Sequence, residues 1–386
     1  TKAKATLQDL EDLPEDEKKA GLVRPRDVEK EHARIIDSLK NPAPDNMDAV
    51  RIVNMHKQFP GVNPKDPPKT AVRSVSFGVK QRECFGLLGH NGAGKTTVIN
   101  MMTGLFPPTS GTGLIGNYDI ATDLDKIYST MGVCPQHNIL WGELSAKEHQ
   151  EFFGRLKGRS GARLQLEVQE NLNSVNLADC ATRPSAGFSG GMQRRLSVAN
   201  SIVGNPGVVY MDEPSTGLDP ASRRQLWDVI SRAKKDKSVI LTTHSMEEAD
   251  VLCDRLGIMS AGRLLCVGPS FDLKRRFGKG YTCVLATKVK DLSNTSAVHS
   301  WITDIFPSAV LLEDPISGTF KYEIDRREVV ISEAFSAIVS GRDKIGLADW
   351  GFTETTLEEV FLKLSHLHGN QNPVDNSFEV AVEKDE

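Results

Sequence analysis

The stretch Gly89-His90-Asn91-Gly92-Ala93-Gly94-Lys95-Thr96-Thr97 fits the pattern G-x-x-x-x-G-K-[ST] at every position. Its glycines let the backbone turn tightly, so that the amides point inward and can cradle phosphate groups. Lys95 would place a cation between the β- and γ-phosphates, and the Thr96 hydroxyl would ligate Mg²⁺. The stretch therefore predicts a loop that binds a nucleoside triphosphate, with contacts expected from Asn91, Gly92, Ala93, Gly94, Lys95, Thr96 and Thr97.

Three further elements follow this loop, in the chain order Gln136, Asp212-Glu213 and His244, and their side chains suit hydrolysis. The apolar run Val208–Met211 ends in Asp212-Glu213. We expect Asp212 to hold Mg²⁺ and Glu213 to polarise the attacking water. His244 stands at the end of another strand-like run and could hydrogen-bond the γ-phosphate. Gln136 follows a third such run, and its amide could reach Mg²⁺ and sense the nucleotide. A strand-end acid or histidine is common by itself, so the prediction depends on the whole ordered set.

The segment Phe188-Ser189-Gly190-Gly191-Met192 discriminates best between classes of nucleotide-binding protein. Its small residues open a helix, and a helix N-terminus is an anion site. The helical insertion that carries it separates it from the phosphate loop of the same chain. We therefore expect Ser189, Gly190 and Gly191 to serve a second copy facing head to tail, with Asp219 placed to link the two sites. Phe59, ahead of the phosphate loop, could stack on adenine or could be a core residue.

Length, net charge and composition narrow the classes of protein to which this chain could belong. With 386 residues, the chain has room for two or three domains. The formal net charge of −4 gives no basic field for nucleic acid. No apolar run approaches the roughly 18 residues of a membrane helix. The chain opens with Thr1, so a fragment of a longer protein is the simplest expectation. The six cysteines are scattered and are expected to be buried, reduced thiols.

Changes in amino-acid composition and hydrophobic pattern divide the chain into four segments. Residues 1–47 are polar and interrupted by proline, which indicates a linker in which residues 27–40 could form a short charged helix. Residues 48–275 alternate strands and helices, which predicts an α/β domain with a parallel sheet and a mainly helical subdomain at about 137–206. Residues 281–366 indicate a small second α/β domain, and residues 367–386 a disordered tail.

These motifs resemble the nucleotide-binding domain of ABC transporters, and the A subfamily fits best, particularly its half-size members in plants and algae. Three phrases carry most of the resemblance: Leu87–Thr97, Ser189–Ser197 and Met211–Pro220. The segment Thr355–Phe361 looks like the end of that subfamily's appended regulatory domain. The signature has Phe188 and Met192 where Leu and Gln are more common, and Met at that place looks usual for the A subfamily.

The resemblance implies a P-loop NTPase fold, in which a RecA-like core sheet is joined by an antiparallel β portion and a helical subdomain, followed by a small α+β domain. It implies ATP and Mg²⁺ as ligands, with catalytic roles for Glu213, His244, Lys95 and Gln136 and metal contacts from Thr96, Gln136 and Asp212. The implied partners are a second nucleotide-binding domain and upstream transmembrane domains, with no nucleic acid. This piece would be soluble and held at the cytosolic face of a membrane.

The resemblance implies an ATPase that powers transport of lipid or another amphipathic substrate. Two alternatives stay open. A soluble ATPase of the same superfamily could act on ribosomes or nucleic acid, although the ribosomal kind usually has two such domains in one chain and this chain has one. A non-enzymatic binding module is the other alternative, and the presence of Glu213 and His244 speaks against it.

Overall fold

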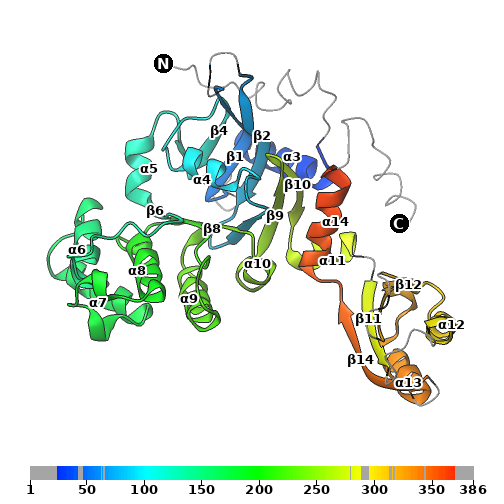
Figure 1. The fold of residues 1–386 in the computed structure, drawn as a ribbon. Coiled ribbons are helices and arrows are strands. Elements are labelled where there is room, and N and C mark those ends of the chain that lie inside the picture. Colours follow the sequence, from blue (N-terminus) through cyan, green and yellow to red (C-terminus); the bar gives the residue numbers. More distant parts are fainter. Residues whose placement is uncertain are drawn as a thin grey trace. The chain divides into compact units, whose positions relative to one another are not determined.

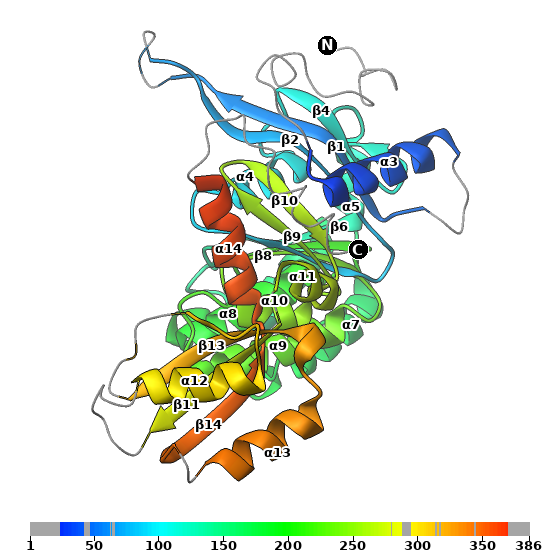
Figure 2. The ribbon, with the colours of Figure 1, turned by 90° about the vertical axis from the view of Figure 1, so that its right-hand side faces the viewer.

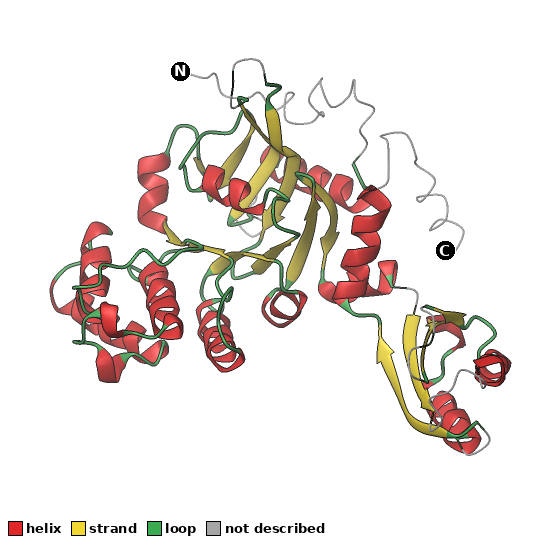
Figure 3. Cartoon of the chain, in the orientation of Figure 1, coloured by secondary structure: helices red, strands yellow, loops and turns green. Residues whose placement is uncertain are grey.

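The computed structural model describes residues 24–41, 47–61, 63, 66–278, 280–287, 295–312, 315, 318–342 and 345–369. Most of the expected linker and nearly all of the expected disordered tail lie outside these residues. The chain divides into two compact units, residues 1–270 with 367–386 and residues 271–366. Figure 1 labels the elements, and Figure 3 separates helices from strands.

A six-stranded sheet forms the centre of the first unit, in the order β10-β9-β3-β8-β7-β6. Five of its strands are parallel, and β10 pairs antiparallel with β9. The central strands are buried on both faces, which explains why they read as continuous apolar runs. The strands are β3 (Cys84–Leu88), β6 (Met131–Cys134), β7 (Val208–Asp212), β8 (Ser238–Thr243), β9 (Arg255–Ser260) and β10 (Arg263–Gly268).

A second, antiparallel sheet has the order β2-β1-β4-β5, with β1 (Val50–Phe59), β2 (Lys69–Val79), β4 (Ser110–Ile115) and β5 (Tyr118–Asp119). Helix α4 (Lys95–Met102) contributes Val98, Ile99 and both methionines to one hydrophobic core with strands of both sheets. Helix α5 (Leu124–Thr130) adds Ile127 to that core. The expected core sheet with an antiparallel β portion is therefore confirmed, and the shared core fixes α4, which begins at the phosphate loop.

Three helices make up the subdomain between β6 and β7: α6 (Ala146–Leu156), α7 (Gly161–Ser174) and α8 (Gly190–Ile202). They group together in Figure 1. A reciprocal capping box between Ser145 and Glu148 starts α6. Ser189 caps α8 by accepting a hydrogen bond from the Met192 amide. Two further helices, α9 (Pro220–Ala233) and α10 (Met246–Leu252), follow β7 and β8.

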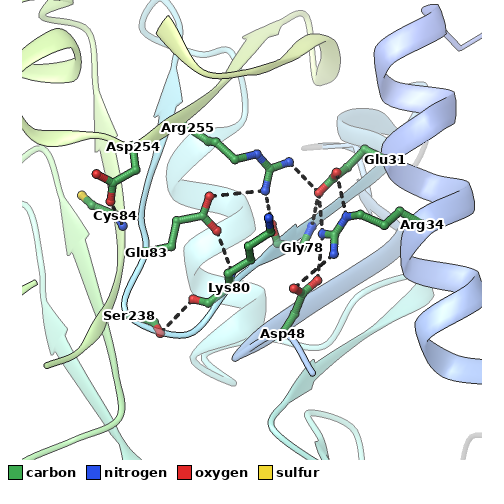
Figure 4. A network of polar contacts seen from close by, with 10 residues as sticks. All are labelled: Glu31, Arg34, Asp48, Gly78, Lys80, Glu83, Cys84, Ser238, Asp254 and Arg255. Carbon is green, nitrogen blue, oxygen red and sulfur yellow. Dashed lines mark hydrogen bonds and ion pairs between the residues drawn. The ribbon is translucent and has the colours of Figure 1, made fainter. Parts of the chain in front are cut away.

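Helix α3 (Arg26–Lys40) lies in the segment expected to be a linker, where the sequence indicates a short charged helix over residues 27–40. Figure 4 shows why the helix is held on the domain. Arg34 contacts Asp48 at 2.8 Å and Glu31 at 2.9 Å, while Arg255 of β9 contacts Glu31 at 2.8 Å and Glu83 at 3.4 Å. Val28, Ile35 and Ile36 are buried as well. The polar composition thus forms buried ion pairs rather than a solvated linker.

The second unit contains a four-stranded antiparallel sheet in the order β12-β13-β11-β14. Its chain order is βαββαβ, a split βαβ arrangement of the ferredoxin type. The elements are β11 (Gly280–Thr287), α12 (Thr295–Ile305), β12 (Val310–Leu311), β13 (Thr319–Asp325), α13 (Ile331–Gly341) and β14 (Leu347–Glu354), and Figure 2 shows this unit from another side. Helices α11 (Ser270–Phe277) and α14 (Leu357–Gly369) flank it in sequence.

None of the helices in the described residues is long and apolar enough to cross a membrane. The structure describes all six cysteines: all are buried, as the sequence predicts, and none is in a disulfide bond.

Candidate nucleotide-hydrolysis site

The phosphate loop lies between β3 and α4, in the strand–turn–helix context that the motif requires. Gly92 and Gly94 adopt φ of +84° and +102°, which L side chains rarely adopt. The Lys95 ammonium donates to the carbonyls of Gly89 at 2.8 Å and His90 at 3.1 Å. Burial lowers the pKa of Lys95, while Glu213 and Asp212 act in the opposite direction. Asn91, Gly92 and Thr96 are exposed, so the outer side of the loop is accessible.

Asp212 ends β7 directly beside the start of α4. Its Oδ1 accepts a hydrogen bond from the Thr96 hydroxyl at 3.1 Å and another from the Thr242 hydroxyl. Asp212 is buried, with 4% of its surface exposed. Two of the three residues predicted to hold Mg²⁺, Thr96 and Asp212, therefore share a hydrogen bond, although they are 116 positions apart in sequence.

Glu213 is the point on which the other predicted residues converge. Its carboxylate lies 3.5 Å from Lys95 Nζ, 3.2 Å from His244 Nδ1 and 3.4 Å from Gln136 Nε2. It also accepts from the Thr216 hydroxyl at 3.2 Å. The Glu213 side chain is 7% exposed, whereas that of His244 is 46% exposed. The buried Glu213 carboxylate thus has a more accessible histidine beside it.

The Glu213 backbone adopts φ of +45°, the left-handed region that is costly for residues other than glycine. Its amide donates to the Thr242 carbonyl and hydroxyl, at 3.1 and 3.0 Å. These bonds to β8 hold the turn that aims the carboxylate. Residue 213 is therefore held in a strained geometry at the place where the predicted chemistry is concentrated.

The signature segment lies elsewhere in the unit. Among the described residues, no hydrogen bond or ion pair joins Ser189, Gly190 or Gly191 to the phosphate loop, and α8 groups with α6 and α7 in Figure 1. A Cβ added at Gly190 would meet nothing within 4 Å, so this helix start is open. Asp219 caps α9 by accepting from the amides of Ala221 at 3.1 Å and Ser222 at 3.0 Å.

Phe59, the predicted adenine-stacking residue, ends β1 and is half-buried. Its ring packs edge-on against Phe106, with centroids 5.4 Å apart. The Lys57 ammonium lies over both rings. The cluster contains an aromatic ring that could meet a purine, and stacking by Phe59 remains a prediction.

Two buried residues near the site were not anticipated from the sequence. Arg194 of α8 donates to backbone carbonyls after β6 and after β7. Glu248 of α10 accepts from the Trp227 indole at 3.2 Å. Burial raises the pKa of Glu248, and hydrogen bonds from Thr243, Ser215 and Trp227 oppose that rise. The sequence feature that could have identified these two residues is a charged side chain on a helix face that is otherwise buried.

Comparison with known proteins identifies the family of this domain. Residues 72–216 match the family model described as ABC transporter. The chain is 52% identical over 313 residues to ABC transporter A family member 7 of Arabidopsis thaliana, which covers 81% of this chain and 33% of that protein. It is 48% identical over 341 residues to A family member 4 of the same plant, covering 88% and 36%.

The chain contains an ABC transporter ATP-binding domain. Its resemblance to the A family is confirmed, and so is the expected enzyme class, an ATPase. A solved ATP-binding subunit of an ABC transporter is 27% identical, with a TM-score of 0.53, over 60% of this chain and 93% of that one. The fold is also shared with the dimeric structure of a post-hydrolysis ATP-binding cassette bound to ADP and Pi. That protein is 24% identical to this chain, with a TM-score of 0.52 over 57% of this chain and 98% of that one. The chain spans about a third of the length of its curated relatives.

Proposed function

We propose that this ABC domain hydrolyses Mg-ATP and powers a membrane transporter of the A family type. One observation carries the proposal: Lys95, Gln136 and His244 all reach Glu213, immediately beside the hydrogen-bonded pair of Thr96 and Asp212. An ammonium, an amide and an imidazole around one carboxylate, beside a pair of oxygens that suits a metal ion, form the set that phosphoryl transfer to water requires.

Each side chain has one role in this scheme. The phosphate-loop amides and Lys95 hold the β- and γ-phosphates, so Lys95 must exchange its bonds to the Gly89 and His90 carbonyls for phosphate oxygens. Glu213 orients the attacking water and accepts its proton. His244, which is more exposed than Glu213, hydrogen-bonds the γ-phosphate, and its contact with Glu213 keeps it at the right edge of the site.

The oxygens of Thr96 and Asp212 fit Mg²⁺, because hydroxyl and carboxylate oxygens are its usual protein ligands. Thr96, Asp212 and Gln136 would hold the ion, which supplies neutralisation of charge on the β- and γ-phosphate oxygens. The Thr96–Asp212 distance of 3.1 Å brings both oxygens within reach of one ion.

We propose that the second half of the site comes from another nucleotide-binding domain. The open N-terminus of α8 is capped by Ser189 and has free space at Gly190, so it can receive the γ-phosphate bound by a facing domain. Asp219 at the start of α9 is placed to connect the two halves. ATP would then act as the bridge between two domains, and its hydrolysis would release them.

Coupling to the membrane is proposed at an apolar surface behind Gln136. Ile139, Trp141, Phe152 and Leu156 are 63%, 42%, 41% and 68% exposed, and the Trp141 and Phe152 rings pack 5.0 Å apart. Exposed aromatic and aliphatic side chains gathered in this way mark interaction sites. We propose that transmembrane domains dock here, with this domain at the cytosolic face of a membrane.

We propose that the transported substrate is a lipid or another amphipathic molecule and that the second unit, residues 271–366, regulates the ATPase. Both proposals rest on the family resemblance.

The first test of the function is Glu213→Gln, measured by light scattering with and without Mg-ATP. ATP binding with slow turnover and an ATP-dependent dimer supports the scheme. Turnover at the wild-type rate excludes Glu213 as the group that activates water.

A further inference from the structure

Arg194 donates hydrogen bonds to the backbone on both sides of the candidate site, although no role in binding the nucleotide is assigned to it. It projects from α8 and is 3% exposed. Its Nε donates to the Pro214 carbonyl at 2.6 Å, and its Nη2 donates to those of Asp212 at 3.0 Å and Glu213 at 3.2 Å. Three consecutive carbonyls, beginning at the last residue of β7, therefore point at one guanidinium.

The remaining nitrogen of the same side chain holds a second loop. Nη1 donates to the carbonyls of Pro135 at 2.6 Å and Gln136 at 3.1 Å, and to the side-chain oxygen of Asn138 at 3.3 Å. The planar fork of arginine can satisfy acceptors in two directions at fixed geometry, which a lysine ammonium does not reproduce. One side chain thus sets the separation between the backbones of Gln136 and Glu213, whose side chains meet at 3.4 Å.

The next residue provides a contrast. Successive helical residues point about 100° apart, so Arg195 faces a different direction from Arg194. It is half-buried and donates to the Gly191 carbonyl at 3.4 Å and the Val175 carbonyl at 3.2 Å, both within the helical subdomain. Arg195 therefore supports its own subdomain, whereas Arg194 reaches the strand ends that carry the site.

The strained turn at residue 213 explains why such a cation would be needed. A non-glycine residue at φ of +45° costs on the order of 1–2 kcal/mol and persists only when its surroundings hold it. The Thr242 contacts hold the Glu213 amide, and Arg194 holds the carbonyls on either side of it.

We infer that Arg194 is a positioning residue for hydrolysis: it fixes the turn that aims Glu213 and makes that turn follow the movement of α8. The inference rests on the proposed role of Glu213. Because the N-terminus of α8 is the proposed contact with the second ATP, docking of a facing domain would be transmitted through Arg194 to Gln136 and Glu213. ATP binding to the phosphate loop does not depend on it.

The test compares Arg194→Met, Arg194→Lys and the matched control Arg195→Met in the full chain. For each variant, the ATP dissociation constant and the single-turnover hydrolysis rate are measured separately. We expect Arg194→Met to lower the rate by roughly 10- to 100-fold while the dissociation constant stays within about threefold, since a misplaced catalytic group costs rate rather than binding. Arg194→Lys should recover part of the rate, and Arg195→Met should stay close to wild type.

A double variant decides whether Arg194 acts through Glu213. If it does, Arg194→Met should add little further loss in the Glu213→Gln background. Losses that multiply, an equal loss in Arg195→Met, or a parallel loss of ATP binding would each overturn the inference. Should Arg194→Met fail to fold, Arg194→Lys carries the same comparison. Loss of activity in Glu213→Gln with none in either Arg194 variant overturns this inference alone, whereas an active Glu213→Gln overturns the proposed function.

Discussion

Gly190→Ala should separate the nucleotide site of one chain from the site shared by two. Gly190 is the first residue of α8, its φ is not positive, and a Cβ there would meet nothing within 4 Å. Alanine is the better helix former by up to about 1 kcal/mol, so the free energy of unfolding should stay equal or rise slightly. For a domain of this size, that corresponds to a melting temperature raised by no more than roughly 2–4 °C.

The shared site should respond differently. If the α8 N-terminus contacts the γ-phosphate of a facing domain, the added methyl group displaces that phosphate from the helix amides. Loss of one charge-assisted hydrogen bond costs about 1.5–3 kcal/mol, which is roughly a 10- to 100-fold weaker dimer. ATP binding to the single chain should not change, because the phosphate loop lies elsewhere in the unit.

The assay is light scattering with Mg-ATP in the Glu213→Gln background, with ATP affinity and melting temperature measured alongside. Gly351→Ala is the matched control, because that residue of β14 also has open space and no positive φ. Gly191→Ala is a poorer choice, since its Cβ would lie 2.6 Å from the Ser222 hydroxyl. Dimerisation that is equally strong in Gly190→Ala and the control would refute the two-chain site.

Three further outcomes are expected. Glu213→Gln should keep ATP binding and lower turnover by on the order of 10²–10⁴, and steady-state hydrolysis at the wild-type rate would contradict it. Lys95→Ala should weaken ATP binding by roughly 10- to 100-fold by titration calorimetry, because it removes charge-assisted bonds to phosphate; unchanged affinity would remove Lys95 from the site. Acid should destabilise the first unit through Glu31: burial raises the pKa of Glu31, but hydrogen bonds and charges from Arg34 and Arg255 outweigh it and lower that pKa to about 2. A depressed carboxyl pKa stabilises the fold above its unfolded value near 4.5, so on the order of 3 kcal/mol should be lost as the pH falls from about 5 to 2. Urea titrations of wild type and Glu31→Gln over this range should converge at low pH, and a constant gap between them would exclude the ion pairs as the cause.

Local sequence patterns were sufficient to predict the strand and the helix on either side of the phosphate loop. The run before Gly89 predicts a buried strand and the residues after it a helix, and β3 and α4 are there. The helices of the subdomain and of the second unit also follow their apolar periodicity. Strands β4, β5, β10 and β14 were missed. In β14 most side chains are half-buried or exposed, and the strand pairs with β11 alone, so its sequence has no clear alternation.

Helix α3 was expected as a short charged helix within a linker, but its packing against the first unit was not expected. Whether Glu31 and Arg34 are solvated or buried depends on Asp48, Glu83 and Arg255, which lie up to about 220 positions away. No local window of sequence contains both Glu31 and Arg255.

By itself, the sequence determined the identity and order of the nucleotide motifs, because backbone turns and side-chain chemistry of the phosphate loop are local properties of nine residues. Only the tertiary structure decided how those motifs meet. Parallel pairing of β3, β7 and β8 brings Thr96, Asp212 and His244 to one sheet edge, and the left-handed turn at Glu213 directs its carboxylate toward them. The contacts of Arg194 across two loops are likewise set by packing, because a guanidinium finds its carbonyl partners only after the strands that carry them have paired.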